Sequence, residues 1–88
     1  MKIQAEISLY PLRTSNLSKP IEEFLNTLRH KELEIESGSM SIRITGDFDT
    51  VFTVLRSAFT CVADKYDVVM SVKMSNACPE EVRGNHRS

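Results

Sequence analysis

Hydrophobic and polar residues alternate along four separate stretches of the chain. In residues 2–9 the apolar side chains are Ile3, Ala5, Ile7 and Leu9. The same alternation recurs in residues 32–36, 40–45 and 68–75. Because successive side chains of a strand point to opposite faces, this period of two predicts four strands, each buried on one side. Pro11 is expected to end the first strand and Gly46 the third.

Two longer stretches have the spacing of amphipathic helices. The first has one apolar stripe at positions i, i+3, i+4 and i+7, which consists of Ile21, Phe24, Leu25 and Leu28. Ser18 is expected to cap this helix, with Pro20 in its first turn, and the helix is expected to run to about Lys31. The second helix is expected to follow a cap at Asp47 and to end near Lys65. Its broad apolar face is expected to contribute most of the core. The residues of this face are Phe48, Val51, Phe52, Leu55, Ala58, Phe59 and Val62.

The order of these elements predicts an α+β fold of the ferredoxin-like type. Strand, helix, two strands, helix, strand gives a βαββαβ sandwich, in which an antiparallel four-stranded sheet has the order 4-1-3-2. Both helices then cover one face, toward which the last strand turns Val68, Met70, Val72 and Met74. The other face is left uncovered and polar. Residues 1–79 are predicted to form this single domain, and residues 80–88 a polar C-terminal tail.

Composition narrows the classes of partner. A chain of 88 residues supports one domain with a limited core, so self-association is expected to add stability. A formal net charge of -1 offers no basic surface for nucleic acid. No apolar stretch is long enough for a membrane helix, and the N-terminal residues do not resemble a signal peptide. We therefore expect a cytoplasmic protein, in which Cys61 and Cys78 are free thiols.

The residue types that catalysis needs are poorly represented. His30 and His86 are the only histidines, and neither has a serine or cysteine nucleophile near it in sequence. The spacings that bind zinc or nucleotide phosphates are missing, so no metal or cofactor is expected. An acylphosphatase-like enzyme needs an arginine in a glycine-rich loop after the first strand, and Arg13 lacks those glycines. The sequence thus favours binding over catalysis.

Three stretches together resemble one known family. They are Ile7-Ser8-Leu9-Tyr10-Pro11-Leu12, the hairpin from Ser37 to Asp47, and Val72-Lys73-Met74-Ser75-Asn76-Ala77-Cys78-Pro79. In this order they are similar to the YkoF-like thiamine- and hydroxymethylpyrimidine-binding proteins, and the resemblance covers roughly residues 3 to 80. It implies a ferredoxin-like fold that binds thiamine or its hydroxymethylpyrimidine moiety without catalysis. Some members carry two such units in tandem. A single unit therefore implies a homodimer or homotetramer, with ligand near the subunit contacts.

The uncovered face offers residues suited to such a ligand. Tyr10 is able to stack on an aminopyrimidine, and serine hydroxyls or carboxylates to bond its amino group and ring nitrogens. The predicted ligand-binding residues are Glu6, Ser8, Tyr10, Glu36, Ser39 and Ser41. Each has a purely structural alternative: Tyr10 packs at a strand end, Glu6 pairs with Arg43 or Lys73, and Ser39 shapes the hairpin turn. A regulatory module for another metabolite, such as an amino acid, and a structural adaptor stay open as functions.

Overall fold

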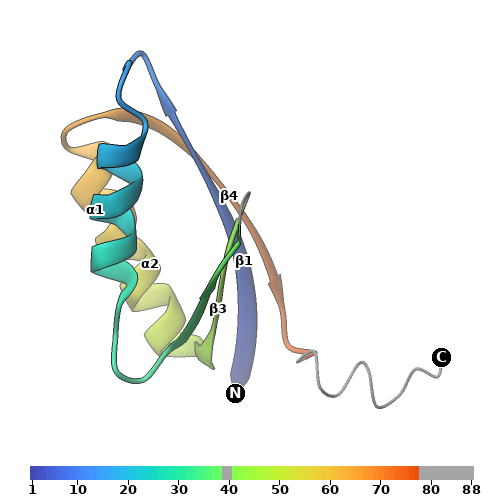
Figure 1. Cartoon of the computed structure of the whole chain (residues 1–88). Coiled ribbons are helices and arrows are strands. Elements are labelled where there is room, and N and C mark those ends of the chain that lie inside the picture. Colours follow the sequence, from blue (N-terminus) through green and yellow to red (C-terminus); the bar gives the residue numbers. More distant parts are fainter. Residues whose placement is uncertain (39–40, 78–88) are drawn as a thin grey trace, which may run out of the picture.

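The computed structural model describes residues 1–38 and 41–77 of the chain, and its elements follow the predicted order (Figure 1). The strands are β1 (Lys2–Leu12), β2 (Glu34–Ser37), β3 (Ile42–Asp47) and β4 (Asp67–Ser75). The helices are α1 (Ser18–Leu28) and α2 (Phe48–Ala63). Ser39 and the tail predicted for residues 80–88 lie outside the described residues.

The four strands form one antiparallel sheet in the order β2-β3-β1-β4, which confirms the ferredoxin-like prediction. β1 pairs with β3 from Lys2 to Ile7, and with β4 from Gln4 to Leu12. Both helices lie on the same side of the sheet, and no other described element covers its opposite face (Figure 1). We call this opposite side the open face.

The core lies between the helices and the sheet, as the alternation predicts. β1 and β3 contribute Ile3, Ala5, Ile7, Ile42 and Ile44, all buried. The helices contribute Phe24, Leu28, Val51, Val54, Leu55, Ala58 and Val62. Removing this apolar surface from water is the main force that holds the helices against the sheet. Among the described residues, no polar or charged side chain is fully buried.

Two strands run further than the sequence predicts. Pro11 does not end β1, because β3 has already stopped pairing at Ile7 and no described strand needs a hydrogen bond from Pro11 on that side. Gly46 does not end β3; it pairs with Ile3. Asp47 then caps α2 as predicted, since its carboxylate accepts from the backbone N–H of Asp49 at 3.1 Å.

α1 is capped by a different residue from the one predicted. Ser18 is already helical, and Leu17 before it has helical dihedral angles and makes no side-chain cap bond. The Asn16 side-chain oxygen instead accepts from the N–H of Lys19 at 3.4 Å, which is the spacing of an N-cap. The helix ends at Leu28 and not near Lys31.

The edge of the apolar layer is more exposed than the periodicity predicts. Val72 and Met74 lie opposite Ile7 and Ala5, on the helix side of β4, yet they are 36% and 38% exposed. Phe52 on α2 is 48% exposed. For Val72 and Met74 the cause is that β4 is the edge strand of the described sheet, so the helices cover only part of it. No helix in the described part of the chain is both long and apolar enough to cross a membrane.

Candidate functional site

A hollow of about 100 Å³ lies on the helix side of the sheet, between α1 and the hairpin end of β2 and β3. We call it the apolar hollow. Its walls are mainly aliphatic, and two serines and a glycine lie at its hairpin side. The lining residues are Ile7, Leu9, Ile21, Leu25, Ser37, Gly38, Ser41 and Ile42.

The strand register explains why the hollow forms at this corner. β3 pairs with β1 only as far as Ile7, whereas β1 continues to Leu12 beside β4 alone. Among residues 1–38 and 41–77, Leu9 therefore has no paired neighbour on its hairpin side. Ile21 and Leu25, one turn apart on α1, face this gap and are only half-buried. The result is an apolar recess that the described residues do not fill.

A second, polar hollow of about 250 Å³ lies beside the first, around the same hairpin end. Ser37, Gly38 and Ser41 line both hollows, and the polar one adds Glu36 and Arg43. Arg43 Nη1 contacts Glu36 Oε1 at 3.0 Å. The Ser41 hydroxyl donates to Glu6 Oε2 at 3.1 Å.

The structure divides the residues predicted for the site. Glu36 and Ser41 lie at the hollows, and Glu6 reaches them through its bond with Ser41. Glu6, Ser8 and Tyr10 share the open face of β1, but Ser8 and Tyr10 line neither of these two hollows, and Tyr10 lies opposite Val69 of β4. Glu6 lies opposite Arg43 and Lys73 in register, which are the two partners considered for it from the sequence. Its carboxylate instead accepts a hydrogen bond from the Ser41 hydroxyl.

The apolar wall of the recess is what sequence reasoning missed. Ile21 and Leu25 belong to the stripe that predicts α1, and nothing in their spacing separates a residue lining a recess from one filling the core. Their half-exposure arises only from the short register between β1 and β3.

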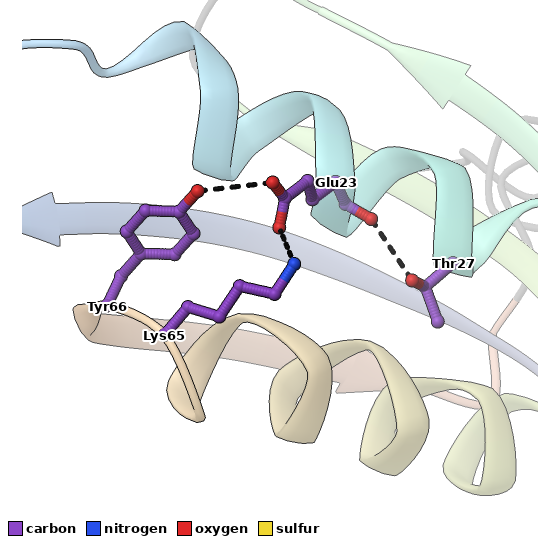
Figure 2. Close-up of polar contacts among 4 residues, drawn as sticks. All are labelled: Glu23, Thr27, Lys65 and Tyr66. Atoms are coloured by element: carbon purple, nitrogen blue, oxygen red, sulfur yellow. Dashed lines mark hydrogen bonds and ion pairs between the residues drawn. The ribbon is translucent and has the colours of Figure 1, made fainter.

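A polar cluster lies on the other flank of α1 (Figure 2). The Glu23 carboxylate accepts from Lys65 Nζ at 3.0 Å and from the Tyr66 hydroxyl at 3.1 Å. The hydrogen bond from Lys65 lowers the pKa of Glu23, and the same bond raises the pKa of Lys65. Burial, followed by the bond to Glu23, raises the pKa of Tyr66. At neutral pH the cluster therefore holds a carboxylate, an ammonium and a neutral phenol.

Metal-binding chemistry finds no support in the described part of the chain. No group of three or more histidine, cysteine or acidic side chains lies close enough to hold an ion. His30 is occupied locally, since its Nδ1 accepts from the N–H of Glu32 at 3.1 Å. Cys61 is a free, half-buried thiol on α2. Arg13, the residue considered for phosphate chemistry, pairs with Asp67 at the start of β4 at 3.0 Å.

Comparison with known proteins shows the family to which the chain belongs. A model of the YKOF-related family matches residues 2–81. The chain belongs to this family. UPF0045 protein MJ1052 of Methanocaldococcus jannaschii is 27% identical over 82 residues, which cover 91% of this chain and 82% of the relative. These findings confirm the resemblance seen in the sequence.

Solved structures share the fold of this YKOF-related chain. The crystal structure of MJ1052 superposes with a TM-score of 0.80 at 23% identity, covering 94% of each chain. Protein SP2199 from Streptococcus pneumoniae gives 0.83 at 17% identity over the whole of both chains. A candidate thiamine biosynthesis/salvage protein from Thermotoga maritima gives 0.76 at 13% identity, covering 85% of this chain and 83% of that one.

Proposed function

We propose that this protein binds thiamine or its hydroxymethylpyrimidine moiety in the apolar hollow, in the cytoplasm and without catalysing a reaction. The observation that carries the proposal is a recess with aliphatic walls and a few convergent polar groups, which is the usual character of a small-molecule site. Membership of the YKOF-related family supports it, as does the thiamine description of a structural neighbour.

The size of the hollow limits what enters it. A closed cavity of about 150 Å³ holds one benzene ring in a protein interior. The apolar hollow, at about 100 Å³ and open at its mouth, has room for one flat ring. Ile21 and Leu25 would pack on one side of such a ring, and Ile7 on the other. Because only one ring fits, and burying a charged ring among aliphatic side chains is costly, the neutral pyrimidine is expected to enter and the thiazolium ring of thiamine to stay outside.

The charges around the mouth suit the part of the ligand left outside. Glu36 and Arg43 neutralise each other across 3.0 Å, whereas Glu6 is bonded to a neutral serine. With Lys73 opposite Glu6 in register, these groups carry no net charge, but Glu6 is the carboxylate whose hydrogen bond comes from a neutral group. A carboxylate favours the thiazolium cation, and the Ser37 and Ser41 hydroxyls suit the amino group and ring nitrogens of the pyrimidine. Thiamine is thus expected to bind more tightly than its phosphate esters.

Isothermal titration with thiamine, thiamine monophosphate and hydroxymethylpyrimidine tests the proposal. Ile21→Phe places a ring in the apolar hollow and is expected to abolish binding of all three compounds. Tyr10→Ala changes the open face, where the sequence predicted a contact, and is expected to leave affinity in the hollow unchanged. Thermal unfolding of both variants checks that each remains folded.

The outcomes separate the alternatives clearly. Loss of binding in Tyr10→Ala, with Ile21→Phe unaffected, would place the ligand on the open face. Stabilisation by amino acids alone would favour the regulatory module instead. If wild-type protein gives neither heat nor a thermal shift with any thiamine compound, the proposed function is wrong.

We further propose that the protein acts as a homo-oligomer. A long, unpaired edge strand readily pairs with another chain, and β4 is nine residues long with Val72 and Met74 partly exposed. Native mass spectrometry is expected to give a dimer or tetramer. Replacing both residues by lysine is expected to shift it to the monomer, whereas Leu17→Lys, at another exposed apolar position, is expected to leave the assembly unchanged.

A further inference from the structure

α1 presents two different flanks to its surroundings. On one flank, Ile21 and Leu25 form a wall of the apolar hollow. On the other, Glu23 turns toward the corner where α2 ends and β4 begins (Figure 2). Any displacement of α1 away from that corner therefore moves Ile21 and Leu25 relative to the sheet.

The attachment of α1 is uneven. It packs chiefly against α2, and much less against β1. Its buried side chains are Pro20, Phe24 and Leu28, none of which lines the apolar hollow. The flank that faces the hollow has only half-buried residues, so van der Waals packing holds it less firmly there. Its position then depends on the buried residues of α1 together with the contacts made by the opposite flank.

Glu23 makes the polar contacts on that opposite flank. Its carboxylate bonds both Lys65 and Tyr66, which lie between the end of α2 and the start of β4. The Glu23 side chain is only 23% exposed, whereas that of Lys65 is 57% exposed. Partial removal from water strengthens hydrogen bonds to a charged group. We call these three residues the Glu23 clamp.

We propose that Glu23 is a positioning residue for the binding site. By fixing α1 to the α2–β4 corner, the Glu23 clamp holds Ile21 and Leu25 at the separation from Ile7 that one flat ring requires. The clamp touches no ligand and acts only through α1. This inference rests on the proposed function, because it assigns the hollow to a ring-shaped ligand.

Glu23→Ala tests the inference, because alanine removes both contacts and keeps a high helix propensity. Glu22→Ala is the matched control, since Glu22 is exposed, lies on the same helix and carries the same charge. We expect Glu23→Ala to weaken hydroxymethylpyrimidine binding about three- to ten-fold at 25 °C, and Glu22→Ala to leave it unchanged. Glu23→Gln, which keeps one oxygen acceptor, is expected to lie between Glu23→Ala and wild type.

A merely structural role for Glu23 predicts a different result. It would lower the melting temperature in Glu23→Ala and leave the dissociation constant unchanged, and that outcome would overturn the inference. Lys65→Met is expected to weaken binding similarly, and adding it to Glu23→Ala is expected to have little further effect. Full additivity of the two losses would also overturn it.

Amide hydrogen exchange separates this inference from the proposed function. In Glu23→Ala without ligand, exchange is expected to increase across α1 while β3 keeps its protection. Unchanged exchange in α1 would overturn the clamp even if wild-type protein binds thiamine. If wild-type protein binds no thiamine compound, the proposed function fails, and the exchange result alone then decides whether Glu23 fixes α1.

Discussion

At the scale of single residues, Gly46 shows how closely two segments approach each other. A Cβ atom at this position would collide with the Leu33 side chain and lie 3.2 Å from the Glu32 carbonyl oxygen. Leu33 is buried, so it has little freedom to move aside. Glycine at position 46 is therefore required by space and not by a turn, since the strand continues through it.

We accordingly predict that Gly46→Ala is destabilising. Overpacking of this kind costs about 1–3 kcal/mol, and urea unfolding measures the change in free energy. Ser71→Ala, at an exposed strand position, serves as the control and is expected to change stability very little. Equal unfolding midpoints for the two variants would show that the Leu33 contact relaxes without cost.

At the scale of elements, two residues are candidates for the N-cap of α1, and the structure distinguishes them. Asn16 accepts a hydrogen bond from the N–H of Lys19, whereas Ser18 lies within the first turn. A second bond holds Asn16 in place, since its own N–H donates to the Thr14 hydroxyl at 3.2 Å. The loop before α1 is thus ordered by local side-chain bonds to the backbone.

Asn16→Ala is therefore expected to lower the free energy of unfolding by about 1 kcal/mol, and Ser18→Ala to leave it nearly unchanged. Circular dichroism during urea unfolding measures both effects. The reverse ranking would return the capping role to Ser18, as the sequence alone suggested.

At the scale of the whole molecule, charged contacts join distant parts of the chain, and those of Asp47 and Glu23 shift pKa values. Asp47 accepts from the N-terminal ammonium group of Met1 at 3.3 Å, and Glu23 joins α1 to the α2–β4 corner. The bond from the N-terminus, followed by the bond from Asp49, lowers the pKa of Asp47 below its ordinary value of 3.8. The Lys65 bond lowers the pKa of Glu23 below 4.5.

The sign of the resulting pH dependence follows from linkage. A carboxyl group whose pKa is lower in the folded state stabilises that state above its unfolded pKa, and the contribution is lost as the pH falls through the folded value. For Asp47 this loss sets in as the pH falls below about 4. Asp47→Asn keeps a capping oxygen and removes the charge, so its melting temperature is expected to fall less than that of wild type between pH 5 and 3. Parallel falls in the two proteins would exclude Asp47 as a source of acid sensitivity.

The sequence predicted most of the fold because the periodicity of each segment is a local property. Ile3, Ala5, Ile7 and Leu9 indicate which side of β1 is buried, whatever its neighbours are. Errors arose where a neighbour decides the outcome. Pro11 stays in β1 because the pairing with β3 ends at Ile7, and Val72 is partly exposed because β4 has no outer partner among the described strands. Of the residues predicted to bind ligand, Glu36 and Ser41 line the hollows while Ser8 and Tyr10 do not, and which of them touches a ligand stays a prediction.

By itself, the sequence determined the order of the elements, the buried side of each strand, the cap of α2 and the family. All of these depend on residues that are close in the chain or on motifs in a fixed order. Only the tertiary structure decided where a recess forms. The apolar hollow exists because the pairing of β1 with β3 stops at Ile7 while α1 is held toward α2. That difference in register and packing involves residues far apart in sequence, which no local pattern records.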